Sequence, residues 1–548
     1  TVDHIVLDDL YVHDVDGNVI NKHMANGGIY FIVEKPTDEN ATGASKFNDL
    51  TIENCSVVTT NRWGIAAAYT YAWAQLNSAH LNEAALEKYA SSNVTIQNNY
   101  IKAAGGDAIT TMYVDQPLVQ YNVAEDCSRQ MNPTDYPSGW QRVAAGIWPW
   151  KCKDSVFQYN ECYNNQYAYH GNGDGQAWDA DWTDGTLYQY NYSHGNSRGA
   201  IMFCGAEAVN TTFRYNISEN ELTGPLDLPG NPDAHIYNNT FYMNENIKSI
   251  FDRTGGNAVL ENNIFYYGGS TPLNQNWYPG GTLTYDNNLY YNFANTPSGD
   301  QNAVVVNAGT KVLEDAGSGP SSNTSGIAYI KENASVFDGY KLAEDSPAIN
   351  AGKVITDNNG YDLEHDFFGH ALTDIPEIGA AESDYVTVTA TSNVYNVAND
   401  QISGLAKHTT VKELLKNLNI DSSTQVTVKS GDKVLAENDV VNGGCTVTIS
   451  YGEKSKTYTI VASSDCELKS TVYMMTGTTI KIPSTEKNPA TVSEVKQNVK
   501  TSSTATVSVI SDDKVLANTD TIADGMTLRI TAEDGTTSDY VIAVKNNY

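Results

Sequence analysis

A short phrase that ends in asparagine recurs along the first half of this 548-residue chain and constrains its fold more than any other feature. Each copy places a few strand-forming residues before the asparagine, as in Val94-Thr-Ile-Gln-Asn-Asn99 and Leu187-Tyr-Gln-Tyr-Asn191. The asparagines that end the copies are Asn99, Asn122, Asn160, Asn191, Asn216, Asn239, Asn263 and Asn288. They are separated by 23, 38, 31, 25, 23, 24 and 25 residues, so longer steps interrupt a regular short period.

A repeat of this length predicts a solenoid in which each copy forms one coil. Stacked asparagine amides hydrogen-bond along the axis of such a coil, and asparagine tolerates the left-handed backbone that its tight turns require. We therefore expect an all-β chain in which residues 1–383 form a right-handed parallel β-helix with helical and loop insertions. An antiparallel sandwich would instead show variable spacing and Asn-Gly hairpin turns.

The remainder of the chain differs in composition. Residues 300–383 lose the repeat and resemble the closing segment of many secreted bacterial β-helix proteins. After residue 383 tryptophan is absent, and two similar modules follow at residues 384–465 and 466–548. We expect two small β-rich accessory domains, each with one short helix, that serve as spacers or as props against the β-helix.

The three long steps of the repeat cover residues 55–99, 122–160 and 160–191. Long excursions from a regular scaffold commonly carry binding or active-site loops. The first excursion contains a helix-like stretch over residues 65–89. Seven of the eight tryptophans fall in the excursions, which predicts a cleft with aromatic walls: Trp63, Trp73, Trp140, Trp148, Trp150, Trp178 and Trp182.

The formal charge of −32 excludes several partners. Nucleic acid would require basic patches that the chain lacks, and an acidic polysaccharide is disfavoured for the same reason, so a neutral substrate fits better. No apolar run approaches the roughly 20 residues of a membrane span. The seven cysteines form neither a zinc pattern nor a disulfide framework, which favours buried thiols.

The last long step contains an acidic segment, Gly171 to Gly185, with four aspartates and two tryptophans. Paired carboxylates perform glycosidic bond cleavage, and aromatic faces hold the apolar face of a sugar ring. A solvated acidic loop or a calcium loop would have a similar composition. The concentration of tryptophan around the segment favours catalysis by a carboxylate pair.

With this Gly-Asp-Gly…Trp-Asp-Ala-Asp segment, residues 1–380 resemble the β-helical lacto-N-biosidases of the LnbX type, glycoside hydrolase family 136. The resemblance implies retaining hydrolysis of lacto-N-tetraose to lacto-N-biose and lactose. It also implies that Asp174 is the acid/base and Asp181 the nucleophile, with Asp179 as the neighbour that could replace either. Some members of the family have a separately encoded folding partner.

Other polar and aromatic residues are candidates for substrate binding. They are Trp178, Trp182, His170, Asp179, Trp148, Trp150, Gln141, Arg142, His194 and Arg198. For the two histidines a structural role is the alternative, and for Asp107 a turn is favoured over an acid near the site. The sequence requires no cofactor. A structural calcium ion is left open at residues 357–362, where a plain turn is favoured because the EF-hand spacing is missing.

The expected protein is thus a secreted or cell-surface bacterial glycosidase acting on neutral oligosaccharides. A β-helical polysaccharide lyase and a non-catalytic glycan-binding adhesin are the alternatives. The chain begins directly with a strand-like pattern, so we also expect a preceding segment or a separate capping chain to cover the apolar side chains of the first coil, such as Val6, Leu10 and Val12.

Overall fold

The computed structural model describes residues 2–16, 26–77, 82–129, 143–166, 174–323 and 329–545, the last range without residues 357–358, 362, 374, 384, 407, 453, 463–464, 486–487, 503–504 and 534. The chain divides into two compact units, Thr1–Tyr385 and Val386–Tyr548. Among the described residues, no helix is both long enough and apolar enough to cross a membrane.

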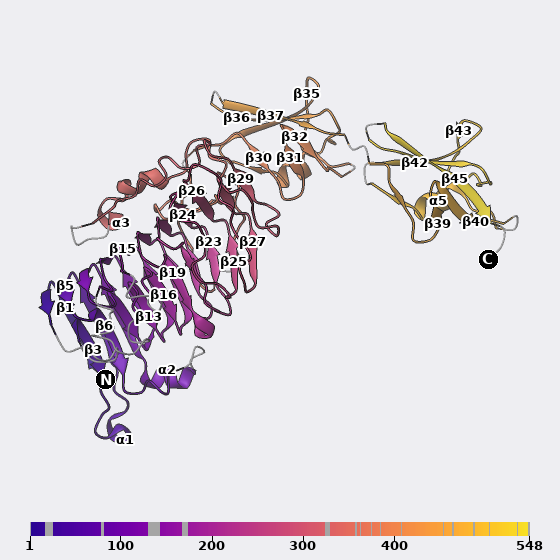
Figure 1. The fold of residues 1–548 in the computed structure, drawn as a ribbon. Helices are drawn as coiled ribbons and strands as arrows, with labels where there is room; N and C mark the ends of the chain where they lie inside the picture. The colour runs from indigo at the N-terminus through magenta and orange to yellow at the C-terminus, as the bar shows by residue number, and fades with distance from the viewer. Residues whose placement is uncertain are drawn as a thin grey trace. The chain divides into compact units, whose positions relative to one another are not determined.

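The first unit is a coil of parallel strands that passes repeatedly through three sheets (Figure 1). Sheet 1 contains β1 (Val2–Asp8), β4 (Phe47–Glu53), β7 (Ser91–Gln97), β10 (Val114–Asp115), β11 (Leu118–Gln120), β14 (Lys153–Gln158), β17 (Asp184–Gln189), β20 (Thr212–Arg214), β23 (His235–Tyr237), β25 (Ala258–Glu261) and β27 (Leu283–Asp286). Sheet 2 contains β2 (Tyr11–Val15), β5 (Ser56–Thr60), β8 (Tyr100–Ala104), β12 (Val123–Glu125), β15 (Glu161–Tyr163), β18 (Tyr192–His194), β21 (Ile217–Glu219), β24 (Thr240–Met243), β26 (Ile264–Tyr267), β28 (Leu289–Tyr291) and β29 (Val304–Val306).

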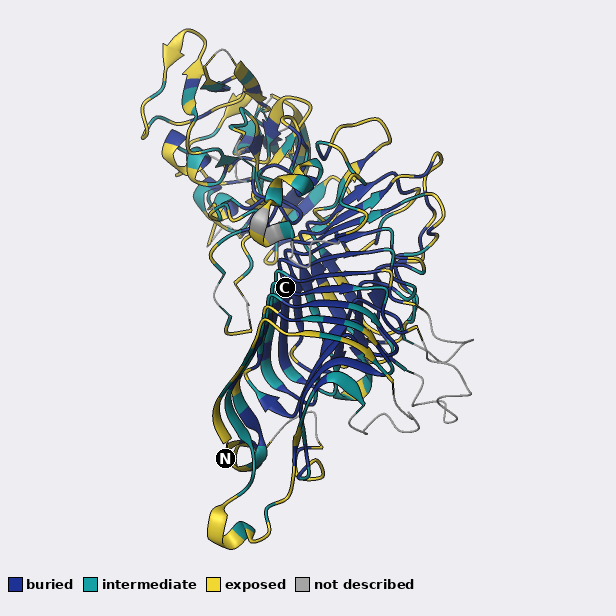
Figure 2. Cartoon of the chain, turned by 90° about the vertical axis from the view of Figure 1, so that its left-hand side faces the viewer, coloured by how far each residue is buried: buried dark blue, intermediate teal, exposed yellow. Residues whose placement is uncertain are grey.

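Sheet 3 is shorter and contains β3 (Gly27–Val33), β6 (Trp63–Thr70), β9 (Ile109–Met112), β13 (Ile147–Trp150), β16 (Trp178–Asp181), β19 (Ile201–Cys204) and β22 (Leu226–Asp227). The helices of this unit are α1 (Glu39–Thr42), α2 (Glu83–Tyr89) and α3 (Tyr329–Glu332), with 3₁₀ turns η2 (Gly205–Glu207) and η3 (Ala334–Tyr340). The long parallel sheets agree with the predicted β-helix. Apolar side chains from all three sheets fill the interior of the coil, and most of the strand residues are buried (Figure 2).

The asparagine ladder is present as predicted. Seven ladder asparagines, from Asn99 to Asn263, are each joined to the next by two hydrogen bonds of 2.9–3.1 Å. The backbone N–H and Nδ2 of one asparagine donate to Oδ1 of the next. The ladder ends when Asn288 donates in the same way to Asp300 Oδ2 at 3.2 and 3.0 Å. An aspartate suits the end of the ladder because its carboxylate oxygen accepts these hydrogen bonds, and it has no amide group that would need a further acceptor.

The structure corrects one detail of the ladder. The left-handed residue is the one before each ladder asparagine, and at four turns it is a tyrosine, for example Tyr159 with φ 55° and Tyr190 with φ 57°. The ladder asparagine follows it and supplies the hydrogen bonds. The turn therefore accepts a large side chain, because the left-handed conformation is stabilised by the buried amide next to it.

The described residues between 307 and 383, here called the return segment, pack along the turn between sheets 1 and 2 and contact its outward tyrosines. Tyr192 Oη donates to Pro320 O at 3.1 Å, and Tyr190 Oη donates to His365 O at 2.9 Å. Apolar residues of the segment form one buried cluster with these tyrosines. This part of the coil is therefore shielded from solvent.

A second expectation is wrong in part. The helix-like stretch over residues 65–89 contains strand β6, which extends sheet 3, and α2 is the helix among its described residues. The alanine-rich run from Ile65 to Ala68 is fully buried, which explains its apolar composition without a helix.

The second unit contains two copies of one small β-rich arrangement. The first has β30 (Ala390–Thr391), β31 (Asn396–Ala398), β32 (Gln401–Ser403), α4 (Val411–Lys416), β33 (Asn419–Ile420), β34 (Gln425–Ser430), β35 (Lys433–Val434), β36 (Thr446–Tyr451) and β37 (Lys454–Ile460). The second has β38 (Leu468–Lys469), β39 (Met474–Thr476), β40 (Thr479–Pro483), α5 (Val492–Gln497), β41 (Lys500–Thr501), β42 (Thr506–Ser511), β43 (Lys514–Val515), β44 (Thr527–Thr531) and β45 (Thr537–Lys545). Each copy has its own core, and Thr410 and Thr491 cap the equivalent helices.

Candidate functional site

The acidic segment enters sheet 3 as strand β16, between β13 and β19. Side chains of a strand alternate between two faces, so Trp178 and Ala180 point into the coil while Asp179 and Asp181 share the outer face. Asp181 pairs in register with Trp150 on one side and with Cys204 on the other. Two carboxylates are therefore fixed on a rigid sheet surface.

Cys204 belongs to the same cluster. One carboxylate oxygen each from Asp179 and Asp181 and the Sγ atom of Cys204 lie within 4.8 Å of one another. Burial raises the pKa of the Cys204 thiol well above its usual value, and the charges of Asp181, Asp179 and Asp174 raise it further. The thiol therefore stays protonated and serves as a hydrogen-bond donor to Asp181. The same three groups lie close enough to hold a metal ion.

Asp174 reaches the cluster from the chain that leads into β16. Its Oδ1 lies 3.4 Å from a terminal nitrogen of Arg253. The next residue, Gly175, has φ 131°, and a Cβ atom there would lie 2.9 Å from Gln166 O, so only glycine fits. This close approach of two backbones fixes the position of the backbone next to Asp174.

Arg253 is held in place by Asp227, which is fully buried at the end of β22. Arg253 Nε lies 2.9 Å from both carboxylate oxygens of Asp227, and its Nη2 lies 2.5 Å from Oδ2. Gln176 Nε2 donates to the same Oδ2 at 2.5 Å. Burial raises the pKa of Asp227 although the hydrogen bonds and charge of Arg253 lower it.

Lys151 lies at the opposite side of the cluster, in the turn after β13. Its Nζ is 3.4 Å from the centre of the Trp182 ring, which lies in the equivalent turn after β16. Burial lowers the pKa of Lys151 to about 8, although the charges of Asp181 and Glu207 act to raise it. A lysine with this pKa exchanges its proton near neutral pH.

The structure brings several predicted residues together. Asp174, Asp179 and Asp181 surround one region of sheet 3. Trp150 and Trp182 lie beside this region. Arg198 packs near Gly175, and its Nε donates to Asp252 at 2.7 Å. His170, Gln141, Arg142 and Trp140 lie outside the described residues, as do Asp357 and Asp362 of the calcium candidate.

Three predicted substrate contacts are wrong. Trp178 is 0% exposed and packs in the core 6.0 Å from the ring of Tyr188, so its face is closed to a sugar. Trp148 is 1% exposed and its Nε1 donates to Asp107 Oδ1 at 3.1 Å. His194 belongs to sheet 2, where its ring stacks on Tyr163 and Tyr192 beneath the return segment.

One expectation gains detail and another changes. Asp107 follows two bends and lies in no strand, as expected of a turn residue, and its carboxylate forms a fully buried ion pair with Arg62 at 2.7 Å. The aromatic-walled cleft is also reduced, because three of the seven tryptophans expected to line it are buried: Trp63, Trp148 and Trp178. Trp150 and Trp182 are partly exposed beside the acidic cluster, whereas Trp73 is 46% exposed. The site therefore has an aromatic edge instead of aromatic walls.

Sequence reasoning missed Arg253, Asp227, Cys204, Lys151 and Gln176. One signal could have found Asp227: in register, β16, β19 and β22 place Asp179, Met202 and Asp227 in one row. Their spacing of 23 and 25 residues follows the ladder period. The sequence carries no comparable signal for Arg253, because it lies beyond the last strand of sheet 3.

Comparison with known proteins agrees with the resemblance expected from the sequence. No family model matches the chain. A curated lacto-N-biosidase of Bifidobacterium longum subsp. longum is 46% identical over 482 residues, which is 80% of this chain and 30% of that protein. The chain thus spans about 30% of the length of this relative.

Two crystal structures of a lacto-N-biosidase of family GH136 from Eubacterium ramulus are also similar. The native form is 42% identical with a TM-score of 0.46, and the selenomethionine form is 43% identical with a TM-score of 0.45. Each match covers 49% of this chain and 42% of the other. The predicted resemblance to lacto-N-biosidases is confirmed at the level of sequence.

Proposed function

We propose that this chain carries the catalytic β-helix of a lacto-N-biosidase, which hydrolyses lacto-N-tetraose to lacto-N-biose and lactose. The observation that supports it most directly is the gathering of Asp174, Asp179 and Asp181 at one region of sheet 3. The 46% identity to the curated lacto-N-biosidase gives the substrate class. A dense group of carboxylates beside partly exposed aromatic rings is the chemistry that glycosidic bond cleavage uses.

In the proposed mechanism Asp181 is the nucleophile. Its carboxylate attacks the anomeric carbon and forms a covalent glycosyl-enzyme intermediate. The Cys204 thiol and the nearby charge of Lys151 favour the ionised form of Asp181, which a nucleophile requires. Its place on strand β16 keeps the attacking oxygen fixed relative to the sugar.

Asp174 acts as the acid/base. It protonates the glycosidic oxygen in the first step and removes a proton from water in the second. Arg253 lies 3.4 Å from Asp174 Oδ1 and makes shorter contacts to Asp227. Asp179, which faces the same side, is the alternative for this role.

The test is hydrolysis of lacto-N-tetraose by Asp174→Asn and Asp181→Asn. Both variants should lose activity by orders of magnitude and keep the wild-type unfolding temperature. With an activated aryl leaving group, Asp174→Asn should retain its first step better than Asp181→Asn does, because protonation of the leaving group then matters less. Asp184→Asn is the matched control, since Asp184 belongs to the same acidic segment but lies in sheet 1. Near-native turnover of both site variants would place the chemistry elsewhere.

We further propose that the coil is right-handed, as parallel strand crossovers are in nearly all proteins, and that the protein acts outside the bacterial cell, where such oligosaccharides occur. We also propose that the first coil packs against additional protein, a preceding segment or a partner chain. Exposed apolar side chains there support this, with Val6 62%, Tyr11 67% and Leu10 39% exposed. Co-expression with the covering part should then raise the solubility of this chain, and an equally soluble, active monomer without it would contradict the proposal.

A further inference from the structure

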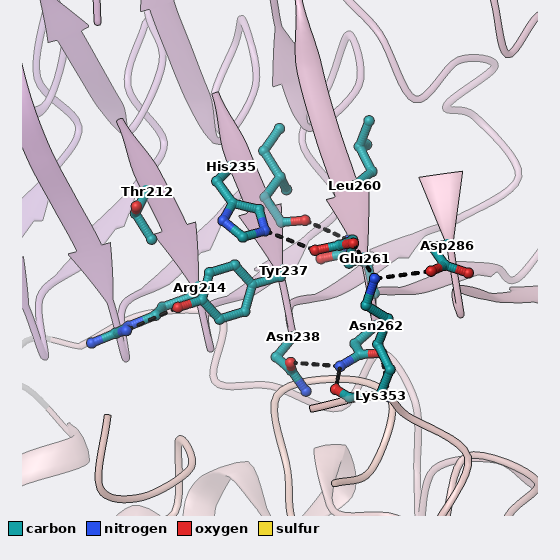
Figure 3. Close-up of polar contacts among 12 residues, drawn as sticks. Thr212, Arg214, His235, Tyr237, Asn238, Leu260, Glu261, Asn262, Asp286 and Lys353 are labelled. Atoms are coloured by element: carbon teal, nitrogen blue, oxygen red, sulfur yellow. Dashed lines mark hydrogen bonds and ion pairs between the residues drawn. The ribbon is translucent and has the colours of Figure 1, made fainter. Parts of the chain in front are cut away.

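The outer face of sheet 1, away from the acidic site on sheet 3, carries an ordered set of polar side chains (Figure 3). The register of β23, β25 and β27 places His235, Val259 and Thr284 in one row. Tyr237, Glu261 and Asp286 form the next row. These side chains alternate with core residues such as Leu260 and therefore point outward.

Lys353 of the return segment fixes the acidic members of these rows. Its Nζ lies 2.5 Å from Glu261 Oε1 and 2.9 Å from Asp286 Oδ2. His235 Nε2 lies 2.9 Å from the other oxygen of Glu261. Burial opposes ionisation of Glu261, but the hydrogen bonds from His235 and Lys353 prevail and lower its pKa. The Glu261 carboxylate is thus ionised, and the contacts of Lys353 hold both carboxyl groups in fixed positions.

Two cavities of about 370 and 540 Å³ lie along this face. Both are lined by Val259 and Glu261, so they lie next to each other on this face, and the two together are here called the groove. The first is also lined by Asp233, His235 and Asn210. Cavities of this size are typical of small-ligand sites.

An aromatic ring stands at the other end of the groove. Tyr278 lines the second cavity and is 48% exposed. Its ring and that of Tyr285 form a T-shaped pair at 5.6 Å and 89°, and its Oη accepts a hydrogen bond from Gly299 N at 3.0 Å. These two contacts hold the ring in place. Val259, 40% exposed, continues this apolar surface between the two cavities.

We propose that this groove, defined by Val259, Glu261 and Tyr278, is a second binding site for a neutral oligosaccharide. Sugar hydroxyls would donate to the fixed carboxylates and accept from amides such as that of Asn302, which lines the second cavity. The apolar face of a sugar ring would rest on Tyr278 and Val259. Glu261, Asp286 and Asp233 repel an anionic glycan, which selects neutral chains.

The polar groups of the groove are fixed in position before a ligand binds, which lowers the entropy lost on binding. It lies on a different sheet from the acidic cluster, so an oligosaccharide can occupy it while another is cleaved. Its role is to retain a glycan near the enzyme without reacting. This inference does not depend on hydrolysis at Asp174 and Asp181.

The test is calorimetric titration of the full chain carrying Asp181→Asn with lacto-N-tetraose. Tyr278→Ala and Val259→Arg are each added to this background, and Tyr451→Ala is the matched control, because Tyr451 is 49% exposed in the second unit. We expect two equivalents of bound tetraose, one at the acidic site, which this background leaves able to bind, and one in the groove that Val259→Arg abolishes and Tyr278→Ala weakens by about tenfold. The control should bind as the background does. Both groove residues are half exposed, so the unfolding temperature should not change.

Equal binding of the tetraose by the background and by the Tyr278→Ala and Val259→Arg variants would overturn the proposal that the groove binds a glycan. Hydrolysis by chains with an intact Asp181 separates this result from the proposed activity. If lacto-N-tetraose is not cleaved but one equivalent still binds in a Tyr278-dependent way, the lacto-N-biosidase proposal fails and the groove stands. If cleavage is normal and binding is insensitive to both substitutions, only the groove fails.

Discussion

Arg253→Met tests how the acidic site is held together. The substitution keeps an unbranched side chain of similar length but removes the guanidinium that joins Asp227 to Asp174. Asp227, 0% exposed, then loses the contacts at 2.9 and 2.5 Å and keeps only the hydrogen bond from Gln176. We expect a less stable first unit and a changed pH dependence of activity.

The size of the effect follows from burial. Removing one partner of a buried ion pair costs about 3–5 kcal/mol, because the remaining charge is left uncompensated. Arg253 is 37% exposed, so water can reach part of the vacated space, and Gln176 still donates to Asp227. We therefore expect Arg253→Met to lower the free energy of unfolding by an amount at the lower end of this range, about 3 kcal/mol at pH 7. The double variant Asp227→Asn/Arg253→Met removes the charge as well and should recover most of this loss.

The loss should depend on pH in a defined direction. The pKa of Asp227 is already raised by burial and rises further without the guanidinium. A carboxyl with a raised folded-state pKa contributes stability that is fully present below the unfolded pKa of about 3.9 and is lost as pH rises toward the folded pKa. Arg253→Met should therefore be only slightly destabilising at pH 4 and fully so at pH 7.

Urea unfolding followed by tryptophan fluorescence measures this effect in the first unit alone, because all eight tryptophans lie between residues 63 and 277. The same variant should shift the basic limb of the kcat/KM profile to higher pH, since Asp174 loses a nearby positive charge and its pKa rises. Equal destabilisation at pH 4 and pH 7, or a double variant as unstable as Arg253→Met, would refute the reasoning.

Three further outcomes are expected. Early NMR of the lacto-N-biose released from lacto-N-tetraose should show the anomeric configuration of the substrate, whereas an inverted product would make Asp181 a base toward water. Asn191→Ala should lower the free energy of unfolding by about 4 kcal/mol, because it orphans two buried donors of Asn160; an effect below about 1 kcal/mol would contradict a cooperative ladder. Burial and the adjacent Glu382 raise the pKa of Glu377, so its contribution to stability is present below pH about 4.3 and is lost as pH rises. Glu377→Gln should therefore raise the unfolding temperature at pH 7 but not at pH 4, and the exposed Glu344→Gln should change neither.

The ladder could be predicted from the sequence because the same residue type, asparagine, recurs at the spacing of one coil. Each amide must meet the next one at about the same place in the following coil, so the period is written directly into the positions of Asn191, Asn216 and Asn239. The residue before each ladder amide has the left-handed conformation, and at four turns it is an asparagine, as expected. At the other four it is a tyrosine, which the sequence argument did not predict because tyrosine is rare in that conformation.

The acidic segment was located correctly, but its side chains were not all assigned to the correct face. Treating residues 174–185 as an irregular loop left Trp178 free to join Asp179 and Asp181. As strand β16, the same residues alternate, and the tryptophan must lie opposite both acids. The alternation was present in the sequence, and what was missing was the evidence that a strand of sheet 3 begins there.

The contacts of Arg253 with Asp227 and Asp174 span 26 and 79 residues, so no local pattern could reveal them. They also place the two aspartates of the proposed catalytic pair in different settings. Asp181 lies on a strand whose neighbours on both sides are in register, which fixes its carboxylate as the proposed nucleophile requires. Asp174 lies before the strand, and its Oδ1 is 3.4 Å from an arginine nitrogen that lies 2.5 Å from Asp227. The aspartate proposed to exchange its proton in each half of the reaction is thus the one outside the regular strand.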